Sequence, residues 1–321
     1  MTHFDVFNGD ADGICALLQL RLAAPADAVL VTGAKRDIAL LERVDARAGD
    51  AVTVLDVSAD TNRVALASLL DRGVTVEYFD HHDAETLPTH PGLRAHIDRS
   101  AAMCTSLIVD RHLDGAQRSW AIVGAYGDNL TGPARACADA LGLDDDQGRK
   151  LRELGDLLSY NAYGDAEADL VVAPERLYRA LVAHRDPFAF LRDAPECRLI
   201  DDQKQADTAL ASLARPYATL AGGVVYVLPD EPWSRRMRGL LANDLANRFP
   251  RLAHAVITPD DSGCYTVSVR SPLERPQGAD ALCRAFPGGG GRRAAAGINH
   301  LPRDELDRFV AAMDAAFPRV A

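Results

Sequence analysis

The sequence predicts an α/β protein: a parallel, doubly wound sheet domain, a helical connector and a smaller C-terminal α+β domain. Over the first 80 residues, short β-type runs alternate with helical patterns, as in parallel sheets covered by helices. From residue 104 to about 213 the pattern is mainly helical, and β-type runs return afterwards. A chain of 321 residues also exceeds what one core usually fills. We therefore expect domains at 1–135, 136–215 and 216–321.

The N-terminal domain is expected to contain four strands and three helices. Each expected strand is a short run of apolar and β-branched residues, and each expected helix has apolar residues at helical spacing. The strands are expected at Phe4–Phe7, Ala28–Thr32, Ala51–Val57 and Val74–Phe79, and the helices near Ile14–Leu22, Ile38–Val44 and Asn62–Leu70.

The C-terminal domain is expected to begin where Pro216 and Gly222–Gly223 break the helical pattern. Its β-type runs and helical patterns alternate less regularly than those of the first 80 residues. The strands are expected at Gly223–Leu228, Ala253–Thr258 and Tyr265–Arg270, and the helices near Ser234–Arg248, Ala279–Phe286 and Arg303–Ala316.

Composition and charge exclude several classes of protein. No apolar run approaches the ~20 residues that span a bilayer, and the acidic N-terminus does not resemble a signal peptide. The six cysteines lie far apart without a CxxC pair, which excludes a zinc ribbon and argues against a disulfide scaffold. We therefore expect a soluble, cytoplasmic protein without a membrane partner.

The net charge of −11 divides into −13 for residues 1–215 and +2 for residues 216–321. Non-specific binding of long nucleic acid depends on neutralising many phosphates, so we expect no long nucleic acid as partner. An acidic half suits divalent cations, and a mildly basic half suits a small anion.

Side chains that commonly bind metal ions follow three of the expected strands. The first strand leads to Asn8-Gly9-Asp10-Ala11-Asp12-Gly13, the third ends at Asp56, and the fourth ends at Asp80-His81-His82-Asp83. Ligands of open α/β sheets bind beyond the carboxyl ends of the strands. Carboxylates mixed with imidazoles suit Mn²⁺ or a related ion, and two such ions sharing a carboxylate would clamp a phosphoryl group.

Each motif also has a plain structural interpretation when it is taken alone. Asp10 and Asp12 with Gly13 also form turns, and Asp56 would equally serve as a helix N-cap. Three such coincidences within 80 residues favour a metal site over three unrelated structural roles.

These residues resemble a known family. The segments NGDADG, LDVS with Asp56, FDHH, and GAYGDN with Asp128 resemble the four motifs of the DHH phosphoesterases. The C-terminal GGGRRAAAG at residues 289–297 resembles the GGGHxxAAG signature of the domain that follows DHH domains. The resemblance covers nearly the whole chain apart from the helical connector, and it is nearest to nanoRNases and linear-dinucleotide phosphodiesterases.

The resemblance implies two Mn²⁺ ions, with Mg²⁺ or Co²⁺ as substitutes. Their implied ligands are Asp10, Asp12, Asp56, His81 and Asp128, of which Asp56 and Asp128 are the bridging candidates. His82 would contact phosphate or assist the leaving oxygen, and Asp80 would orient an imidazole.

Two positions depart from the family pattern. Val6 stands where many oligonucleotide-cleaving members carry a histidine. Asn8, either as a metal ligand or as a residue that supports the ligands, or a water is expected to supply the missing contact. Arg292 replaces the histidine of the GGGH signature, so the pocket gains a permanent cation.

The C-terminal domain is expected to bind the substrate. Glycines let backbone N–H groups approach a phosphate closely. We therefore expect Gly288–Gly291, which precede Arg292, to form an anion pocket. The alternative is a flexible loop. Arg270 and Ser271 resemble a phosphate-contacting stretch of DHH nucleases; the alternative is an edge-strand arginine that extends to solvent. The substrate-binding candidates are Arg270, Ser271, Gly289, Gly290, Gly291 and Arg292.

The sequence thus points to Mn²⁺-dependent hydrolysis of phosphodiester bonds in very short oligonucleotides or linear dinucleotides such as pGpG or pApA, releasing 5′-nucleotide monophosphates. A phosphomonoesterase for a 3′,5′-bisphosphate such as pAp and a polyphosphatase remain alternatives. A non-catalytic nucleotide-binding regulator is the alternative of another class. The oligomeric state and the cleavage polarity stay open.

Overall fold

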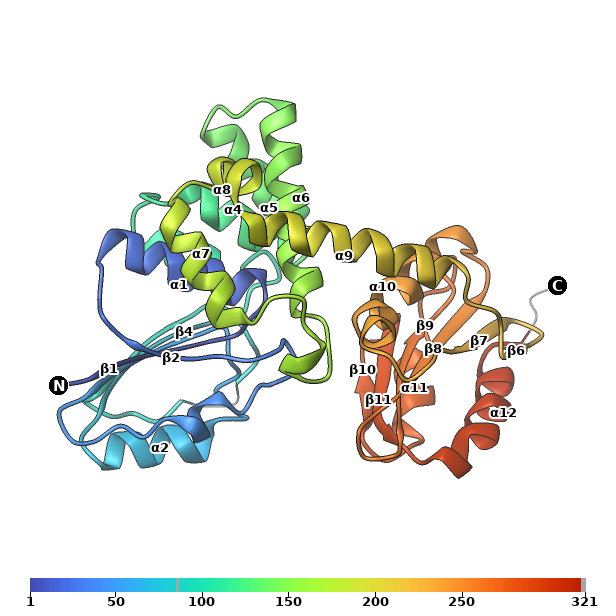
Figure 1. The fold of residues 1–321 in the computed structure, drawn as a ribbon. Helices are drawn as coiled ribbons and strands as arrows, with labels where there is room; N and C mark the ends of the chain where they lie inside the picture. The colour runs from blue at the N-terminus through green and yellow to red at the C-terminus, as the bar shows by residue number, and fades with distance from the viewer. Residues whose placement is uncertain (85–86, 319–321) are drawn as a thin grey trace. The chain divides into compact units, whose positions relative to one another are not determined.

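The computed structural model describes residues 1–84 and 87–318, and the chain divides into two compact units, Met1–Lys204 and Gln205–Ala321 (Figure 1). The first unit contains a five-stranded sheet and the second a six-stranded sheet. All neighbouring strands of the first sheet are parallel, whereas the second sheet is mostly antiparallel. The predicted α/β class, with a parallel sheet followed by a smaller α+β part, is confirmed.

The first sheet has the strand order β2-β1-β3-β4-β5, so three of the four expected strands are direct neighbours in its centre. The sequence pattern missed the last strand because Arg94 and His96 interrupt its apolar run. The strands are β1 (His3–Phe7), β2 (Val29–Val31), β3 (Ala51–Leu55), β4 (Thr75–Asp80) and β5 (Leu93–Ile97).

Helices cover both faces of this sheet (Figure 1). On one face, α2 buries Leu66, Leu69 and Leu70 against the strands. On the other, α1 is buried almost all round because it packs against the sheet and against α3 and α4. The helices are α1 (Ala11–Ala23), α2 (Arg63–Asp71), α3 (Thr105–His112), α4 (Arg118–Gly127), α5 (Thr131–Ala140), α6 (Asp145–Ala162), α7 (Pro174–His184) and α8 (Pro187–Asp193); α9 (Pro195–Ser212) continues into the second unit.

The helix expected near Ile38–Val44 is only a single 3₁₀ turn, Leu40–Arg43. The Asn62 side chain is the reason: its amide donates to the carbonyl of Ile38 at 2.7 Å and accepts the N–H of Leu41 at 3.1 Å. Backbone groups that a side chain already satisfies do not need a regular helix. The expectation of a full helix here was wrong.

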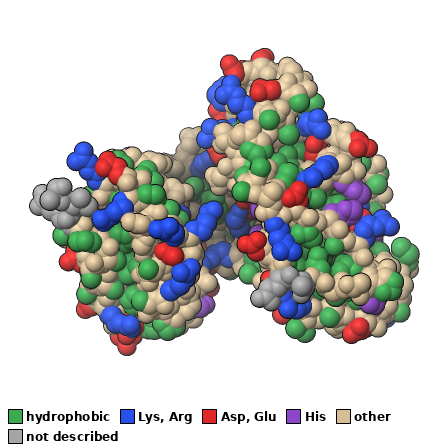
Figure 2. All heavy atoms as spheres, turned by 180° about the vertical axis from the view of Figure 1, so that it is seen from behind, with side chains coloured by type: hydrophobic (Ala, Val, Ile, Leu, Met, Phe, Trp, Pro, Cys, Tyr) green, Lys and Arg blue, Asp and Glu red, His purple; other side chains and the backbone are tan. Residues whose placement is uncertain are grey.

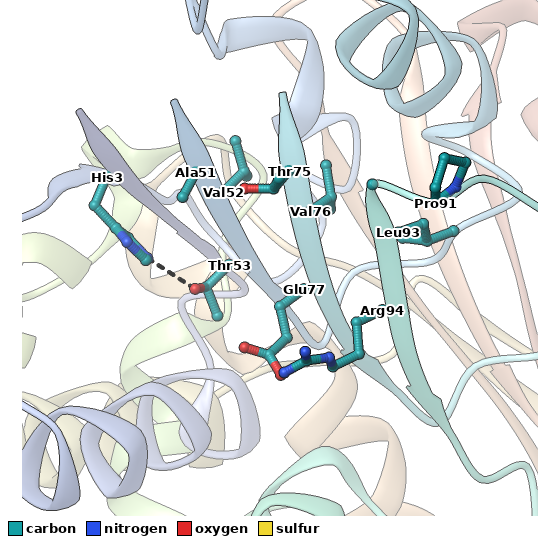
Figure 3. Close-up of a pocket in the computed structure, with 11 residues that line it drawn as sticks. His3, Ala51, Val52, Thr53, Thr75, Val76, Glu77, Pro91, Leu93 and Arg94 are labelled. Atoms are coloured by element: carbon teal, nitrogen blue, oxygen red, sulfur yellow. Dashed lines mark hydrogen bonds and ion pairs between the residues drawn. The ribbon is translucent and has the colours of Figure 1, made fainter. Parts of the chain in front are cut away.

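The face that packs against α1 is polar where the strands begin. Figure 3 shows His3, Thr53, Glu77 and Arg94 around a hollow there, with His3 Nε2 2.9 Å from the Thr53 hydroxyl. Nearby, the Arg21 guanidinium of α1 pairs with the carboxylate of Asp5, its Nε lying 2.8 Å from Oδ2. Asp5 is 1% exposed, so this pair is buried beneath the helix.

Replacing Arg21 with Met should lower the free energy of unfolding by about 3 kcal/mol, because the buried Asp5 carboxylate loses its cation. Burial alone would raise the pKa of Asp5, but Arg21 and His3 outweigh it and hold that pKa below its usual 3.8. The folded protein therefore keeps this charge to lower pH than the unfolded chain. The stabilisation should be constant from neutral pH to about pH 4 and disappear as pH falls further.

Urea titrations followed at the buried Trp120, in a Trp233→Phe background, would measure this difference within the first unit. Arg149→Met is the matched control, because its partners Asp146 and Glu153 are exposed and such pairs contribute about 0–1 kcal/mol. Equal losses for Arg21→Met and Arg149→Met would contradict the buried-pair interpretation.

The second unit places its sheet between helices. α10 packs against β8 and β9, and an apolar core under α11 and α12 contains Val267, Ile298 and Phe309. In strand order, the elements of the sheet are β10 (Gly289–Gly291), β11 (Ala295–Leu301), β9 (Tyr265–Arg270), β8 (Ala253–Pro259), β7 (Gly223–Val227) and β6 (Ala218–Thr219); the helices are α10 (Pro232–Arg248), α11 (Ala279–Arg284) and α12 (Leu306–Ala316).

The glycine run forms a short strand and not the flexible loop that was the alternative to an anion pocket. Gly289–Gly291 forms an antiparallel pair with β11. A side chain at Gly289 would place Cβ 1.9 Å from the carbonyl oxygen of Cys283, so only glycine allows the strand to lie so close to α11. Across the described residues, no helix is long and apolar enough to span a membrane.

Candidate functional site

The acidic and histidine motifs follow three neighbouring strands and therefore lie at one edge of the first sheet. β1, β3 and β4 are neighbours, and their carboxyl ends are followed by Asp10, Asp56 and His81 respectively. The strand order also reverses here, since β2 lies on one side of β1 and β3 on the other. Such a switch point is where open α/β sheets bind ligands.

His81 stands at the centre of three carboxylates. Its Nε2 lies 3.4 Å from Asp56 Oδ1, 3.8 Å from Asp128 Oδ2 and 4.0 Å from Asp12 Oδ2. His82 joins His81 and Asp56 in a second, overlapping group of ligand atoms that lie within 4.8 Å of one another. Four of the five expected metal ligands therefore converge around one imidazole.

Asp128 reaches this edge from a helix end. It follows α4 directly and caps it, with its backbone N–H 2.9 Å from the carbonyl of Gly124. A Cβ at Gly127 would lie 2.3 Å from the Cβ of Ala11. Glycine at this position lets α4 approach the start of α1, which brings Asp128 beside the residues that follow β1.

Neighbouring groups hold the other two carboxylates in place. Asp12 accepts the backbone N–H groups of Thr105 and Ser106 at the start of α3, both at 2.8 Å. Asp56 Oδ1 accepts the Thr105 hydroxyl at 3.1 Å. Asp56 also has a φ of 59°, a strained conformation for a residue other than glycine. Such strain is concentrated at functional sites.

Asp80 and His82 form a pair behind this centre. His82 Nδ1 lies 2.7 Å from Asp80 Oδ1, and Asp80 is completely buried. Among the described residues, the second Asp80 oxygen has no hydrogen-bond partner. Burial alone would lower the pKa of His82, but Asp80 outweighs it and raises that pKa. His82 is thus oriented by its Nδ1 and favours the protonated form.

The crowded carboxylates fit a divalent cation. Burial, followed by the charges of Asp12, Asp10 and Asp80, raises the pKa of Asp56 well above its usual range. Burial and then Asp12 raise the pKa of Asp128 to about 6. A bound cation would relieve both the burial of these charges and their mutual repulsion. Carboxylate oxygens with an imidazole suit Mn²⁺ and related ions.

Asp10, the fifth expected ligand, has other partners. Its Oδ1 caps α1 by accepting the N–H groups of Asp12 and Gly13, both at 3.1 Å. Its Oδ2 lies 2.5 Å from the ammonium nitrogen of Lys35, which is 3.9 Å from Asp128 Oδ1. Burial alone would lower the pKa of Lys35, but Asp10 outweighs it and raises that pKa.

Sequence reasoning missed Lys35 because it lies 25 residues from Asp10, beyond β2. One signal was available: Lys35 is one of only three lysines in a chain with 35 basic residues, and it closely follows the end of a strand.

Asn8 contacts the backbone of Asp10 and of Lys35. Its side-chain oxygen accepts the backbone N–H of Asp10 at 3.1 Å, and its amide donates to the carbonyl of Lys35 at 3.3 Å. Both ends of the amide therefore shape the backbone of the turn. Val6, the position of the missing histidine, is fully buried in the core beneath α2.

The substrate-binding candidates of the second unit differ in accessibility. Arg270 is partly exposed, and Asn243 at 2.6 Å and Ser268 at 3.0 Å hold its guanidinium. Arg292 is exposed at the β10–β11 turn. Figure 2 shows basic side chains distributed over the visible face of this unit. Gly290 has open space where a side chain would lie, while Gly289 and Gly291 are closely packed.

Ser271 is 1% exposed, which contradicts its expected contact with substrate. Its hydroxyl donates to the carbonyl of Arg293 at 3.0 Å and accepts the N–H of Ala279 at 3.2 Å. Ser271 therefore ties β9 to the start of α11 and to the turn before β11.

No family model matches this chain, and no curated protein matches its sequence. Solved structures share its fold. A DHH domain described as a member of the s1p family of ribosomal proteins aligns with a TM-score of 0.68 at 12% identity, covering 99% of this chain and 87% of its own. The exonuclease RecJ bound to manganese aligns with a TM-score of 0.56 at 19% identity, covering 98% and 89%. PggH, a pGpG-specific phosphodiesterase from Vibrio cholerae, aligns with a TM-score of 0.54 at 13% identity, covering 98% of both chains.

Proposed function

We propose that this chain, which has the fold of DHH-domain proteins, is a metal-dependent phosphoesterase that cleaves phosphodiester bonds in very short oligonucleotides or linear dinucleotides. The observation that carries the proposal is the convergence of Asp12, Asp56 and Asp128 on His81 Nε2 at a sheet switch point. Oxygen and imidazole donors at this spacing suit Mn²⁺, with Mg²⁺ or Co²⁺ as substitutes. A divalent ion bound there would lower the pKa of water and neutralise charge on a phosphoryl oxygen.

The protein's own groups prepare the site for this chemistry. The N–H groups of Thr105 and Ser106 hold the Asp12 carboxylate, and the Thr105 hydroxyl holds that of Asp56. Ligands fixed in this way lose little entropy when a cation binds. The Asp80–His82 pair would supply a proton to the leaving oxygen, because Asp80 orients the imidazole and favours its protonated form.

The charge of the chain supports a small substrate. A net charge of −11 disfavours the many phosphate contacts that a long strand requires. We expect Arg270 and Arg292 to contact the one or two phosphates of a dinucleotide, because arginine suits bidentate phosphate contact. Among proteins with this fold, PggH is described as pGpG-specific and RecJ as an exonuclease. We expect 5′-nucleotide monophosphates as products.

Chromatographic product analysis with Mn²⁺ tests the proposal. The substrates would be pGpG, pApA, a 5-mer and a 20-mer RNA, pAp and polyphosphate, each repeated with EDTA. We expect conversion of the dinucleotides to monophosphates, no cleavage of the 20-mer, and complete loss of activity with EDTA, because the carboxylates alone do not activate water.

Other results would replace the proposal. Turnover of pAp or polyphosphate alone would assign a phosphomonoesterase or a polyphosphatase. Nucleotide binding without any cleavage would assign a regulatory binding protein. Activity that survives EDTA and exhaustive dialysis against it would remove the metal from the mechanism.

A further inference from the structure

Lys35 places an ammonium group inside the acidic centre. Its backbone is held on both sides, with the N–H donating to the carbonyl of Ala162 at 3.1 Å and the carbonyl accepting from Asn8 at 3.3 Å. Ala162 ends α6 and Asn8 follows β1. The position of Lys35 is therefore set by two elements of the fold, and its side chain is only 35% exposed.

The ammonium lies beside the position that a second metal ion would need. An ion bound by Asp10 and bridged by Asp128 must lie about 2.0–2.6 Å from an oxygen of each. The nitrogen of Lys35 already lies 2.5 Å from Asp10 Oδ2 and 3.9 Å from Asp128 Oδ1. Two cations on the same carboxylate oxygen would repel each other, since they would be about 5 Å apart or less in a partly buried site.

Both carboxylate oxygens of Asp10 already have partners. Neither group of ligand atoms found among the described residues includes Asp10. Its Oδ1 faces two backbone N–H groups and its Oδ2 faces Lys35. The remaining four candidates, Asp12, Asp56, His81 and Asp128, are enough to hold one divalent ion.

We infer that this chain binds one divalent ion, and that the Lys35 ammonium on Asp10 is a built-in cation in place of the second. The inference rests on the proposed function and refines its metal content. A phosphoryl group bound at the site would then lie between a metal ion and the ammonium, which can offer a further N–H donor to a phosphoryl oxygen.

Counting bound Mn²⁺ tests the inference without measuring activity. Equilibrium dialysis with metal analysis should give about one ion per wild-type chain, and the paramagnetic resonance spectrum should be that of an isolated Mn²⁺ ion. Lys35→Ala should bind about two ions with the broadened spectrum of a coupled pair, because Asp10 is released. The double variant Lys35→Ala, Asp10→Asn should return to one ion.

Arg36→Ala is the matched control, because it removes the neighbouring positive charge. The Arg36 guanidinium pairs with Asp165 at 2.6 Å. The Arg36→Ala variant should still bind one ion. Two coupled ions in the wild-type chain would overturn the inference and leave the proposed function standing. One ion in a folded Lys35→Ala variant would equally overturn it. No bound ion in the wild-type chain would remove the inference together with the metal-dependent function. The wild-type count remains decisive if Lys35→Ala does not fold.

Discussion

Replacing Asp128 with Ala should reduce kcat/KM on a dinucleotide about a thousandfold, with little change in thermal stability. Asp128 contributes one of the three carboxylates around His81 Nε2, at 3.8 Å. A cation at a reacting phosphoryl group stabilises the transition state by several kcal/mol. A loss of about 4 kcal/mol corresponds to a thousandfold reduction in rate. Burial and then the charge of Asp12 raise the pKa of the Asp128 carboxyl to about 6, so its ionised form does not stabilise the fold. Its loss should therefore leave the fold intact.

The measurement combines initial rates with the Mn²⁺ affinity of the same preparations. Both should fall together in Asp128→Ala, because the substitution acts through the metal. Asp139→Ala is the control: this aspartate is exposed on α5 and its loss should change neither quantity. Turnover close to the wild-type rate in Asp128→Ala would exclude Asp128 from the metal centre.

Replacing His82 with Gln should reduce kcat on a dinucleotide by about 10²–10⁴, the usual contribution of a general acid. The substitution should leave the Mn²⁺ content unchanged, because His81 and the carboxylates hold the ion. The loss should be much smaller on a nucleoside 5′-(4-nitrophenyl phosphate), whose leaving group is stable without a proton. This dependence on the leaving group separates a proton donor from a residue that only binds phosphate.

Asp80→Asn should have an intermediate effect of about 10–100-fold, since it removes the carboxylate that orients His82 at 2.7 Å but keeps the imidazole. Comparison of the two substrates within each variant provides an internal control for folding. If both substrates slowed equally in His82→Gln, or if its Mn²⁺ content fell, His82 would be a ligand of the ion rather than the acid.

Most strands and helices were predictable because they depend on local patterns. The runs before Asn8, Asp56 and His81 are apolar and β-branched, and they form β1, β3 and β4 as expected. Four strands escaped prediction, namely β5, β6, β10 and β11. β5 is an edge strand with charged residues. β10 consists of three glycines, a residue type that does not favour strands. Its pairing with β11 and the close approach to Cys283 stabilise it instead.

The motif spacing by itself determined which acids and histidines reach one edge of the sheet. Parallel strands all end at the same edge, so residues that follow β1, β3 and β4 must gather there once the strands are neighbours. Long-range packing decided the rest, namely that Lys35 lies against Asp10 and that Ser271 is buried. A sequence pattern repeats over a few residues, whereas these partners depend on which side chains meet across loops and helix ends. For that reason the acids and the histidine at this edge were predictable from the sequence, and Lys35 beside them was not.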